Sequence, residues 1–149
     1  MLRIAILASG SGTNAERLVE FFRESDLACV KLIATNNPKA GVISRAEAQN
    51  VETLVFDPKT ELQQTLSVLV QKADVVLLAG YLRMIPAEWT RAFQGRMLNI
   101  HPALLPKFGG KGMYGKHVHR AVSEAGETQS GITIHLVNEH YDEGAVLAQ

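Results

Sequence analysis

Residues 1–22 have the sequence MLRIAILASGSGTNAERLVEFF. The apolar run Arg3–Ser9 stops at Gly10, which is typical of a strand buried on both faces. Beyond the glycines, apolar residues recur at the spacing of one helical face, at Ala15, Leu18, Val19 and Phe22. A buried strand joined by a glycine turn to an amphipathic helix predicts the start of a strand–helix–strand unit.

The same alternation continues to residue 100. Further apolar runs predict four strands, at Val30–Thr35, Thr53–Phe56, Val75–Ala79 and Met97–Ile100. Helical patterns lie between them at Ala40–Asn50, at Thr60–Lys72 with Thr60 as N-cap, and after Pro86 with Trp89 and Phe93 inward. In the second of these helices the apolar stripe is expected at Leu62, Leu66, Leu69 and Val70. The predicted fold class is therefore α/β, with a mostly parallel, doubly wound sheet and functional loops beyond the carboxyl ends of the strands.

The second half has a different pattern. A helix is predicted at His117–Ala125, with Gly126 as its stop, and its inner face comprises Val118, Ala121, Val122 and Ala125. Ile132–Val137 alternates apolar and polar residues, which predicts a half-exposed, antiparallel strand near the C-terminus. Val146–Gln149 begins another strand. Lys107–Lys116 holds four glycines without periodicity and is expected to be a loop.

Composition excludes several classes of protein. The 149 residues are 46% hydrophobic, which suits one compact domain, and 15 basic residues balance 15 acidic ones. We therefore expect no nucleic-acid partner and no membrane partner. The single cysteine, Cys29, excludes an internal disulfide and a cysteine-based zinc cluster, and it is expected to be a small core residue. Neither a signal peptide nor a membrane-length apolar run is found, so the expected location is cytoplasmic.

The segment Ser9–Asn14, SGSGTN, follows the first predicted strand. Free backbone N–H groups at the next helix's start, with the side chains of Thr13 and Asn14, suit a phosphate monoester. The third glycine of a dinucleotide fingerprint is missing, no acid follows the second strand at Thr35–Asn37, and the lysine of a P-loop is absent. A glycine-rich turn that binds nothing is the alternative.

Asn99 and His101 end the last strand of the first half, two residues apart, so both point to the same side of the strand. A histidine can exchange a proton near neutral pH, and an asparagine amide can donate to an oxygen that becomes anionic. Asp142, in the turn between the last two strands, could raise the pKa of a histidine beside it. The alternatives are a hydrogen-bonded core histidine and an ordinary turn aspartate. The five histidines show no metal-ligand spacing, so no metal is expected.

The segment Asn99–Pro106, NIHPALLP, resembles the signature of the folate-dependent formyltransferases, and the glycinamide ribonucleotide formyltransferase family matches best. Four other pieces agree with that family in the same order, namely SGSGTN, AGYLRMI at 79–85, SGITIHLVN at 130–138 and YDEG followed by VLAQ. The resemblance extends over residues 1–149 and implies the family's Rossmann-like formyltransferase fold as a single domain. It also implies that the family's C-terminal end is lacking, so residues 1–149 alone are expected to be weakly active or inactive.

The resemblance implies a formyl transfer from 10-formyltetrahydrofolate, as co-substrate, to the amine of glycinamide ribonucleotide in purine biosynthesis. Residues 1–98 would form the phosphate-binding half and residues 99–149 the catalytic and folate-binding half. The substrate phosphate would be held by Gly12, Thr13 and Asn14. The folate would be held by Leu82, Arg83, Met84, Ile85, Asn99, Asn138, Glu139, His140, Tyr141 and Asp142. The catalytic group would be Asn99, His101 and Asp142, without a metal, in a monomer or homodimer. His117 would lie near the phosphate-bearing substrate.

Two departures from the family pattern concern the site's rim. The Lys107–Lys116 loop is longer than in many relatives, and a family arginine after the third strand has only Lys59 as its nearest candidate. Two other classes of function stay open. One comprises the related formyl enzymes, a methionyl-tRNA formyltransferase or a formyltetrahydrofolate hydrolase. The other is a nucleotide-binding module without catalysis.

Overall fold

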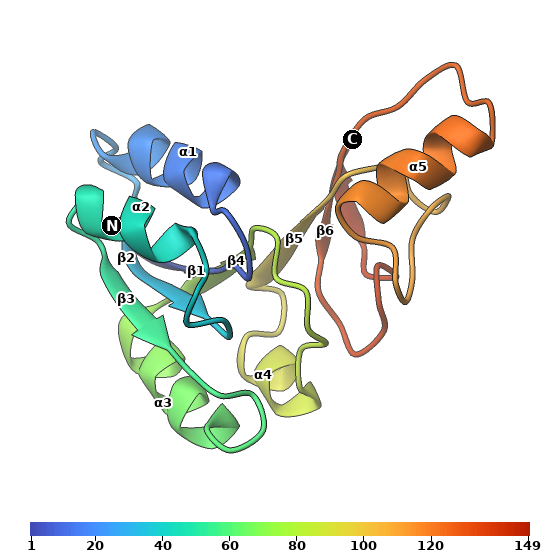
Figure 1. The fold of residues 1–149 in the computed structure, drawn as a ribbon. Coiled ribbons are helices and arrows are strands. Elements are labelled where there is room, and N and C mark those ends of the chain that lie inside the picture. Colours follow the sequence, from blue (N-terminus) through green and yellow to red (C-terminus); the bar gives the residue numbers. More distant parts are fainter. The chain divides into compact units, whose positions relative to one another are not determined.

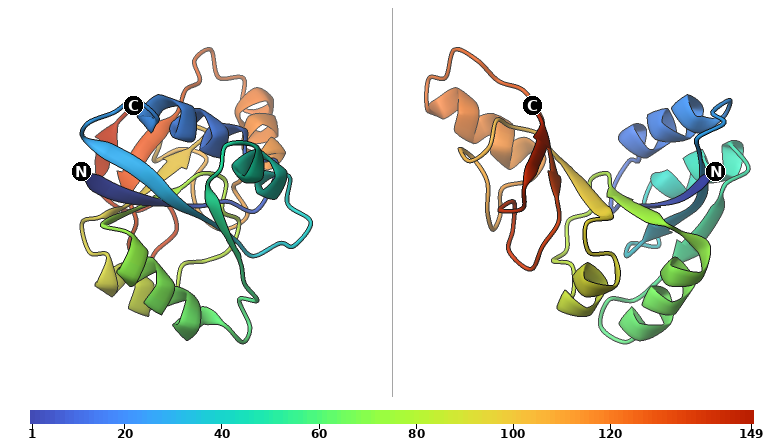
Figure 2. Two further views of the ribbon diagram at one scale, coloured as in Figure 1. Left: turned by 90° about the vertical axis from the view of Figure 1, so that its left-hand side faces the viewer. Right: turned by 180° about the vertical axis from the view of Figure 1, so that it is seen from behind.

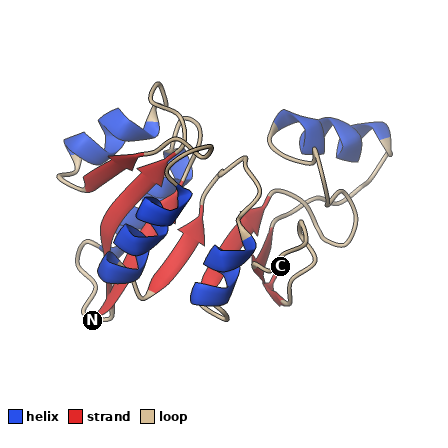
Figure 3. Ribbon diagram, turned by 90° about the horizontal axis from the view of Figure 1, so that it is seen from below, coloured by secondary structure: helices blue, strands red, loops and turns tan.

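The computed structural model describes residues 1–149. They form two compact units, Met1–Leu82 and Arg83–Gln149. Strands and helices alternate along the chain until the second unit ends with two consecutive strands, at Thr133–Leu136 and Val146–Ala148; Figure 3 shows the helices and strands in separate colours. No helix is long and apolar enough to cross a membrane.

The first unit is built on four parallel strands, β1 (Leu2–Leu7), β2 (Ala28–Thr35), β3 (Glu52–Val55) and β4 (Val75–Leu78). Their order is β3-β2-β1-β4, with β1 paired to both β2 and β4. The inner strand β1 is the most buried, and Ala5, Ile6 and Leu7 have no exposed surface. Three helices accompany these strands, α1 (Thr13–Phe22), α2 (Val42–Ala48) and α3 (Leu62–Lys72).

Helices α1 and α2 lie on one face of the four strands and α3 lies on the other (Figures 1 and 2). Ala15 and Val19 of α1 and Val42 of α2 share one buried cluster with Ile4 and Ile6 of β1. Because side chains alternate along a strand, Ala5 and Leu7 face the side of α3, which packs against β1. The doubly wound α/β arrangement is therefore confirmed.

The second unit contains α4 (Ala87–Ala92), β5 (Met97–His101), α5 (Lys116–Glu124), β6 (Thr133–Leu136) and β7 (Val146–Ala148). Strand β6 pairs antiparallel with β5 and with β7, which confirms the antiparallel strand expected near the C-terminus. Trp89 and Phe93 are inward, as predicted, with 1% exposure each. The glycine-rich segment before α5 is a loop, also as predicted, and Gly126 has the left-handed φ of a helix stop.

Four sequence expectations about side chains are wrong. Thr60 is not the N-cap of α3, because Asp57 begins a turn that includes Thr60, and the helix starts one residue after Glu61. The inner face of α3 passes through the buried Thr65 in place of Val70, which is 52% exposed. Cys29 is only half-buried, since the first residues of β2 are incompletely covered. Ala125 is exposed because it lies at the C-cap of α5.

Strand β6 alternates as predicted, but its more deeply buried side chains are the polar ones. Thr133 and His135 are 0% and 2% exposed, whereas Ile134 and Leu136 are only half-buried. Buried polar groups are tolerated when they are hydrogen-bonded. The Thr133 hydroxyl donates to the Ala103 carbonyl at 2.7 Å and accepts from the Leu105 N–H at 3.0 Å. This strand therefore ties the segment that follows β5 to the core.

Candidate active site

Strand β5 presents Asn99 and His101 on one side, two residues apart, as the sequence predicted. His101 is buried, with 2% exposure, and Asn99 is half-buried. In the antiparallel register with β6, Asn99 lies opposite His135 and His101 lies opposite Thr133. Cross-strand neighbours share a face of the sheet, so His135 joins the two predicted residues.

The carboxylate of Asp142 lies at the centre of this group. Its Oδ1 is 3.5 Å from His101 Nδ1, 3.4 Å from His135 Nε2 and 3.5 Å from Asn99 Nδ2. Its Oδ2 accepts a hydrogen bond from the Gly110 N–H at 3.0 Å. Asp142 has a left-handed φ of 56°, a conformation that aspartate tolerates better than most residues. The fold thus brings together the three side chains that the sequence suggested for the catalytic group.

His135 is the member of the site that the sequence prediction missed. Its Nε2 lies 3.1 Å from Asn99 Nδ2, and its Nδ1 donates to the Leu136 carbonyl at 2.9 Å. A usable signal was present, because Thr133 and His135 repeat on one strand the two-residue spacing of Asn99 and His101. A polar pair of that kind on one side of a strand needs either partners or a function.

The electrostatic environment favours a charged pair of protonated His135 and ionised Asp142. Burial alone lowers the pKa of His135, but the hydrogen bond and the charge of Asp142, with the Leu136 carbonyl, raise it above its ordinary value of 6.5. Burial alone raises the pKa of Asp142. The hydrogen bonds from His135 and Gly110 and the neighbouring histidines lower it below 3.8. The site is therefore organised around an ionised carboxylate.

The protonation of His135 decides how Asn99 can be used. A neutral His135 with its proton on Nδ1 accepts from the Asn99 amide NH2 group at Nε2. A protonated His135 donates from both nitrogens, so the amide oxygen of Asn99 is then its better neighbour. In that state the NH2 group of Asn99 turns away from His135 and can serve another acceptor.

The SGSGTN loop ends where Gly12 caps α1, so Thr13 and Asn14 are exposed at a helix N-terminus whose first N–H groups lack intrahelical partners. Arg45 of α2 supports the loop, donating from Nε to the Ser11 carbonyl at 2.9 Å and pairing with Glu16. Gly12 has φ +77°, and a Cβ there would lie 2.7 Å from the Val42 Cα. The close approach that requires glycine at this position is to α2, whereas a Cβ at the exposed Gly10 would meet no atom within 4 Å.

Apart from Asn99 on β5, the residues expected to hold folate lie in two segments. At Leu82–Ile85, Leu82 and Met84 are 45% and 50% exposed while Ile85 is buried. The Leu82 N–H donates to the Ser9 hydroxyl at 3.0 Å, and that hydroxyl donates to Asn36 Oδ1 at 2.6 Å. Polar residues that follow β1 and β2 thus anchor the start of this segment.

The second folate segment, Asn138–Asp142, is a turn between β6 and β7. The side chain of Asn138 accepts from the His140 N–H at 2.9 Å, which shapes the turn. Tyr141 is 38% exposed, and the exposed side chains of Glu139 and His140 lie side by side, with 3.7 Å between Oε1 and Nε2.

Two further positions that the sequence singled out, His117 and Lys59, are exposed. His117 is exposed on α5, with its ring edge-on to Tyr114 at 5.3 Å. Lys59 is exposed in the turn before α3. No group of three or more histidine, cysteine, aspartate or glutamate side chains is arranged to hold a metal ion.

The family model for formyl transferases matches residues 2–149. The chain is 44% identical to the chloroplastic phosphoribosylglycinamide formyltransferase of Arabidopsis thaliana, over 99% of this chain and 53% of that protein. It is 34% identical to the phosphoribosylglycinamide formyltransferase of Haemophilus influenzae, over 100% of this chain and 72% of that protein. The chain thus spans about half the length of the plant relative.

Solved structures agree with these similarities. The glycinamide ribonucleotide transformylase 1 of Symbiobacterium toebii superposes with a TM-score of 0.90 at 33% identity, covering 100% of this chain and 72% of that one. The enzyme of the same name from Geobacillus kaustophilus gives a TM-score of 0.88 at 39% identity, covering 100% of this chain and 81% of that one. With its parallel strands, its antiparallel end and a family match over nearly its whole length, the chain belongs to the formyl transferase family.

Proposed function

We propose that the protein transfers a formyl group from 10-formyltetrahydrofolate to the amine of N1-(5-phospho-D-ribosyl)glycinamide, a step of de novo purine (IMP) biosynthesis. The names of its relatives support this choice of reaction. The observation that carries it is that Asn99 and His101 both lie beside the carboxylate of Asp142.

The chemistry is a direct displacement at the formyl carbon. The substrate amine attacks that carbon, so a new C–N bond forms and the carbonyl oxygen becomes an oxyanion. Asn99 and protonated His101 donate hydrogen bonds to the oxyanion, a contribution that is commonly worth about 10²- to 10³-fold in rate for one donor. Collapse breaks the bond from the formyl carbon to the folate nitrogen, which takes up the proton that the amine loses.

Asp142 contributes both to stabilising the oxyanion and to moving the proton. Its charge favours the protonated form of His135, and a carboxylate held ionised can accept the amine proton, directly or through water. No covalent intermediate with the protein is needed. Holding the two substrates end to end supplies much of the acceleration, because bound reactants have already lost their translational freedom.

The remaining roles concern binding. Gly12, Thr13 and Asn14 would hold the ribonucleotide phosphate at the start of α1, where the helix dipole favours an anion. Leu82–Ile85 would meet the pterin mainly through backbone groups, and the Asn138–Asp142 turn would close over it. Residues 1–98 would then bind the phosphate and supply Leu82–Ile85 to the pterin, and residues 99–149 would supply the other folate contacts and the catalytic group.

The test is a formyl-transfer assay on the full-length protein, with both substrates. His101→Ala and Asp142→Asn are expected to lower kcat by about 10²-fold or more while both substrates still bind. His119→Ala, at an exposed histidine on α5, is the matched control and should be unchanged. Near-normal turnover in either site variant would refute the catalytic assignment.

The same assay separates the other classes. Release of formate without the amine substrate would indicate a formyltetrahydrofolate hydrolase. Transfer that requires a charged tRNA would indicate the tRNA enzyme. Phosphate-ester binding that survives His101→Ala, with no transfer in the unmodified protein, would indicate a nucleotide-binding module.

A further inference from the structure

We propose that the backbone of Phe108–Gly110 is a positioning element that fixes the Nε2–H of His101, so that Nδ1 is the nitrogen that serves the reaction. The inference rests on the proposed function, because the reaction is the formyl transfer proposed above. The geometry that supports it is independent of that function. It assigns a role to part of the Lys107–Lys116 loop.

The two nitrogens of His101 have unequal surroundings. Nε2 lies 2.8 Å from the Phe108 carbonyl oxygen, which can only accept a hydrogen bond, so Nε2 carries the proton of that contact. Nδ1 lies 3.5 Å from Asp142 Oδ1, which is longer than a good hydrogen bond. Nε2 is therefore committed to the backbone, whereas Nδ1 is held near a carboxylate without being tied to it.

Burial makes this choice durable. The His101 side chain is only 3% exposed. A half-turn of the ring would place a carbon atom against the Phe108 carbonyl and leave a buried acceptor without its donor, at a cost of roughly 1–3 kcal/mol. In the neutral ring Nδ1 can accept a proton, and in the charged ring its N–H can donate to the oxyanion.

The same stretch of backbone also holds the carboxylate. The Gly110 N–H donates to Asp142 Oδ2 at 3.0 Å. A Cβ at Gly109 would lie 2.6 Å from the Leu105 Cδ2 and 3.3 Å from the Asp142 Cβ. Three consecutive residues thus set the positions of His101 and Asp142 relative to each other.

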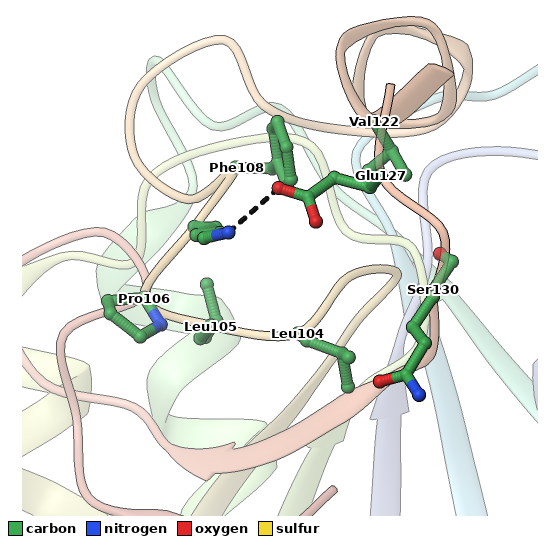
Figure 4. Close-up of a pocket in the computed structure, with 9 residues that line it drawn as sticks. Leu104, Leu105, Pro106, Phe108, Val122, Glu127 and Ser130 are labelled. Atoms are coloured by element: carbon green, nitrogen blue, oxygen red, sulfur yellow. Dashed lines mark hydrogen bonds and ion pairs between the residues drawn. The ribbon is translucent and has the colours of Figure 1, made fainter. Parts of the chain in front are cut away.

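Phe108 is held in an unusual conformation for a bulky residue, with φ +58°. Its side chain helps to line a pocket of about 290 Å³ together with Leu104, Leu105 and Val122 (Figure 4). Lys107 and Glu127, which also line it, form an ion pair at 2.8 Å, drawn as the dashed line in Figure 4. The pocket is not lined by Asn99, His101 or Asp142. The Phe108 side chain therefore faces this pocket, while its carbonyl oxygen accepts the hydrogen bond from His101.

The experiment reads the tautomer of His101 directly, by NMR of full-length protein with ¹⁵N-labelled histidine and with the His101→Asn variant to assign the signals. The expected result is that the neutral form of the ring, whenever it is populated, carries its proton on Nε2. Gly109→Ala crowds the Leu105 side chain and Asp142, so that these side chains or the backbone of residues 108–110 must shift; it should mix the two tautomers and lower kcat about 100-fold, with KM for the amine substrate nearly unchanged.

Gly112→Ala is the matched control. Gly112 lies in the same loop with φ +82°, and a Cβ there meets nothing within 4 Å, so this variant strains the loop without touching the site. It should keep the tautomer of the unmodified protein. A neutral His101 protonated at Nδ1 in the unmodified protein would overturn the proposal, as would a folded Gly109→Ala variant with unchanged tautomer and kcat. The Nε2–H tautomer in a protein without transfer activity would refute the proposed function and still support the positioning by Phe108.

Discussion

Replacing Gly12 by alanine tests how the phosphate-binding loop is built. Gly12 has φ +77°, and its Cβ would lie 2.7 Å from the Val42 Cα, an atom that cannot rotate away. The left-handed backbone alone costs a non-glycine residue about 1–2 kcal/mol. Forcing an additional carbon into a packed contact costs about 1–3 kcal/mol more. We therefore expect Gly12→Ala to lower the free energy of unfolding by about 2–5 kcal/mol, less a few tenths for the stiffer unfolded chain.

Comparison with Gly80→Ala isolates the cost of packing the added carbon against α2. Gly80 has φ +80°, but a Cβ there meets nothing within 4 Å, so only the backbone cost of about 1–2 kcal/mol applies. Urea unfolding of both variants, followed by circular dichroism, measures the difference, which should be about 1–3 kcal/mol. Equal destabilisation by the two substitutions would refute the argument that α2 packs against the loop at Gly12.

Further predictions concern the core and the titrating groups. Trp89→Ala, at a side chain with 1% exposure, should lower the free energy of unfolding by about 3–5 kcal/mol, whereas Phe21→Ala, at a side chain with 76% exposure, should leave the urea midpoint nearly unchanged. Because the pKa of Asp142 is lowered, the unfolded chain takes up a proton below pH 3.8 that the native protein does not; the native protein therefore loses stability there, and Asp142→Asn should flatten that acid limb of the urea midpoint. Because the pKa of His135 is raised, the native protein keeps a proton above pH 6.5 that the unfolded chain loses; stability should fall as the pH rises through this range, and less so in His135→Asn. An unchanged pH dependence in both variants would contradict the charged pair.

Local pattern was sufficient for most of the helices and strands. Strand β1 is an apolar run that is buried on both faces from Ile4 to Leu7, and such a run can be recognised from residue type alone. The inward positions of Trp89 and Phe93 follow from helical spacing alone. The NIHPALLP segment was also sufficient to suggest the family, and the formyl transferase match over residues 2–149 confirms that family.

Finer detail depended on which neighbours were present. Thr60 is not the N-cap because it belongs to a turn that begins at Asp57. Val70 faces outward because the inner face of α3 is set by the elements that the helix packs against. On β6 the apolar side chains are the more exposed ones, since Thr133 and His135 find buried hydrogen-bond partners outside their own strand. A periodic pattern cannot show which face of a strand has such partners.

The sequence by itself determined the fold class, the family and the chemical types of the candidate site, because periodicity and residue type are local properties. Only the tertiary structure decided that Asp142, which follows His101 by forty-one positions in the printed sequence, lies 3.5 Å from it. It likewise added His135 to the group and placed the Phe108 carbonyl on His101 Nε2. These contacts arise when β5 and β6 pair and the following turn folds back, and strand register is set by the packing of the whole unit.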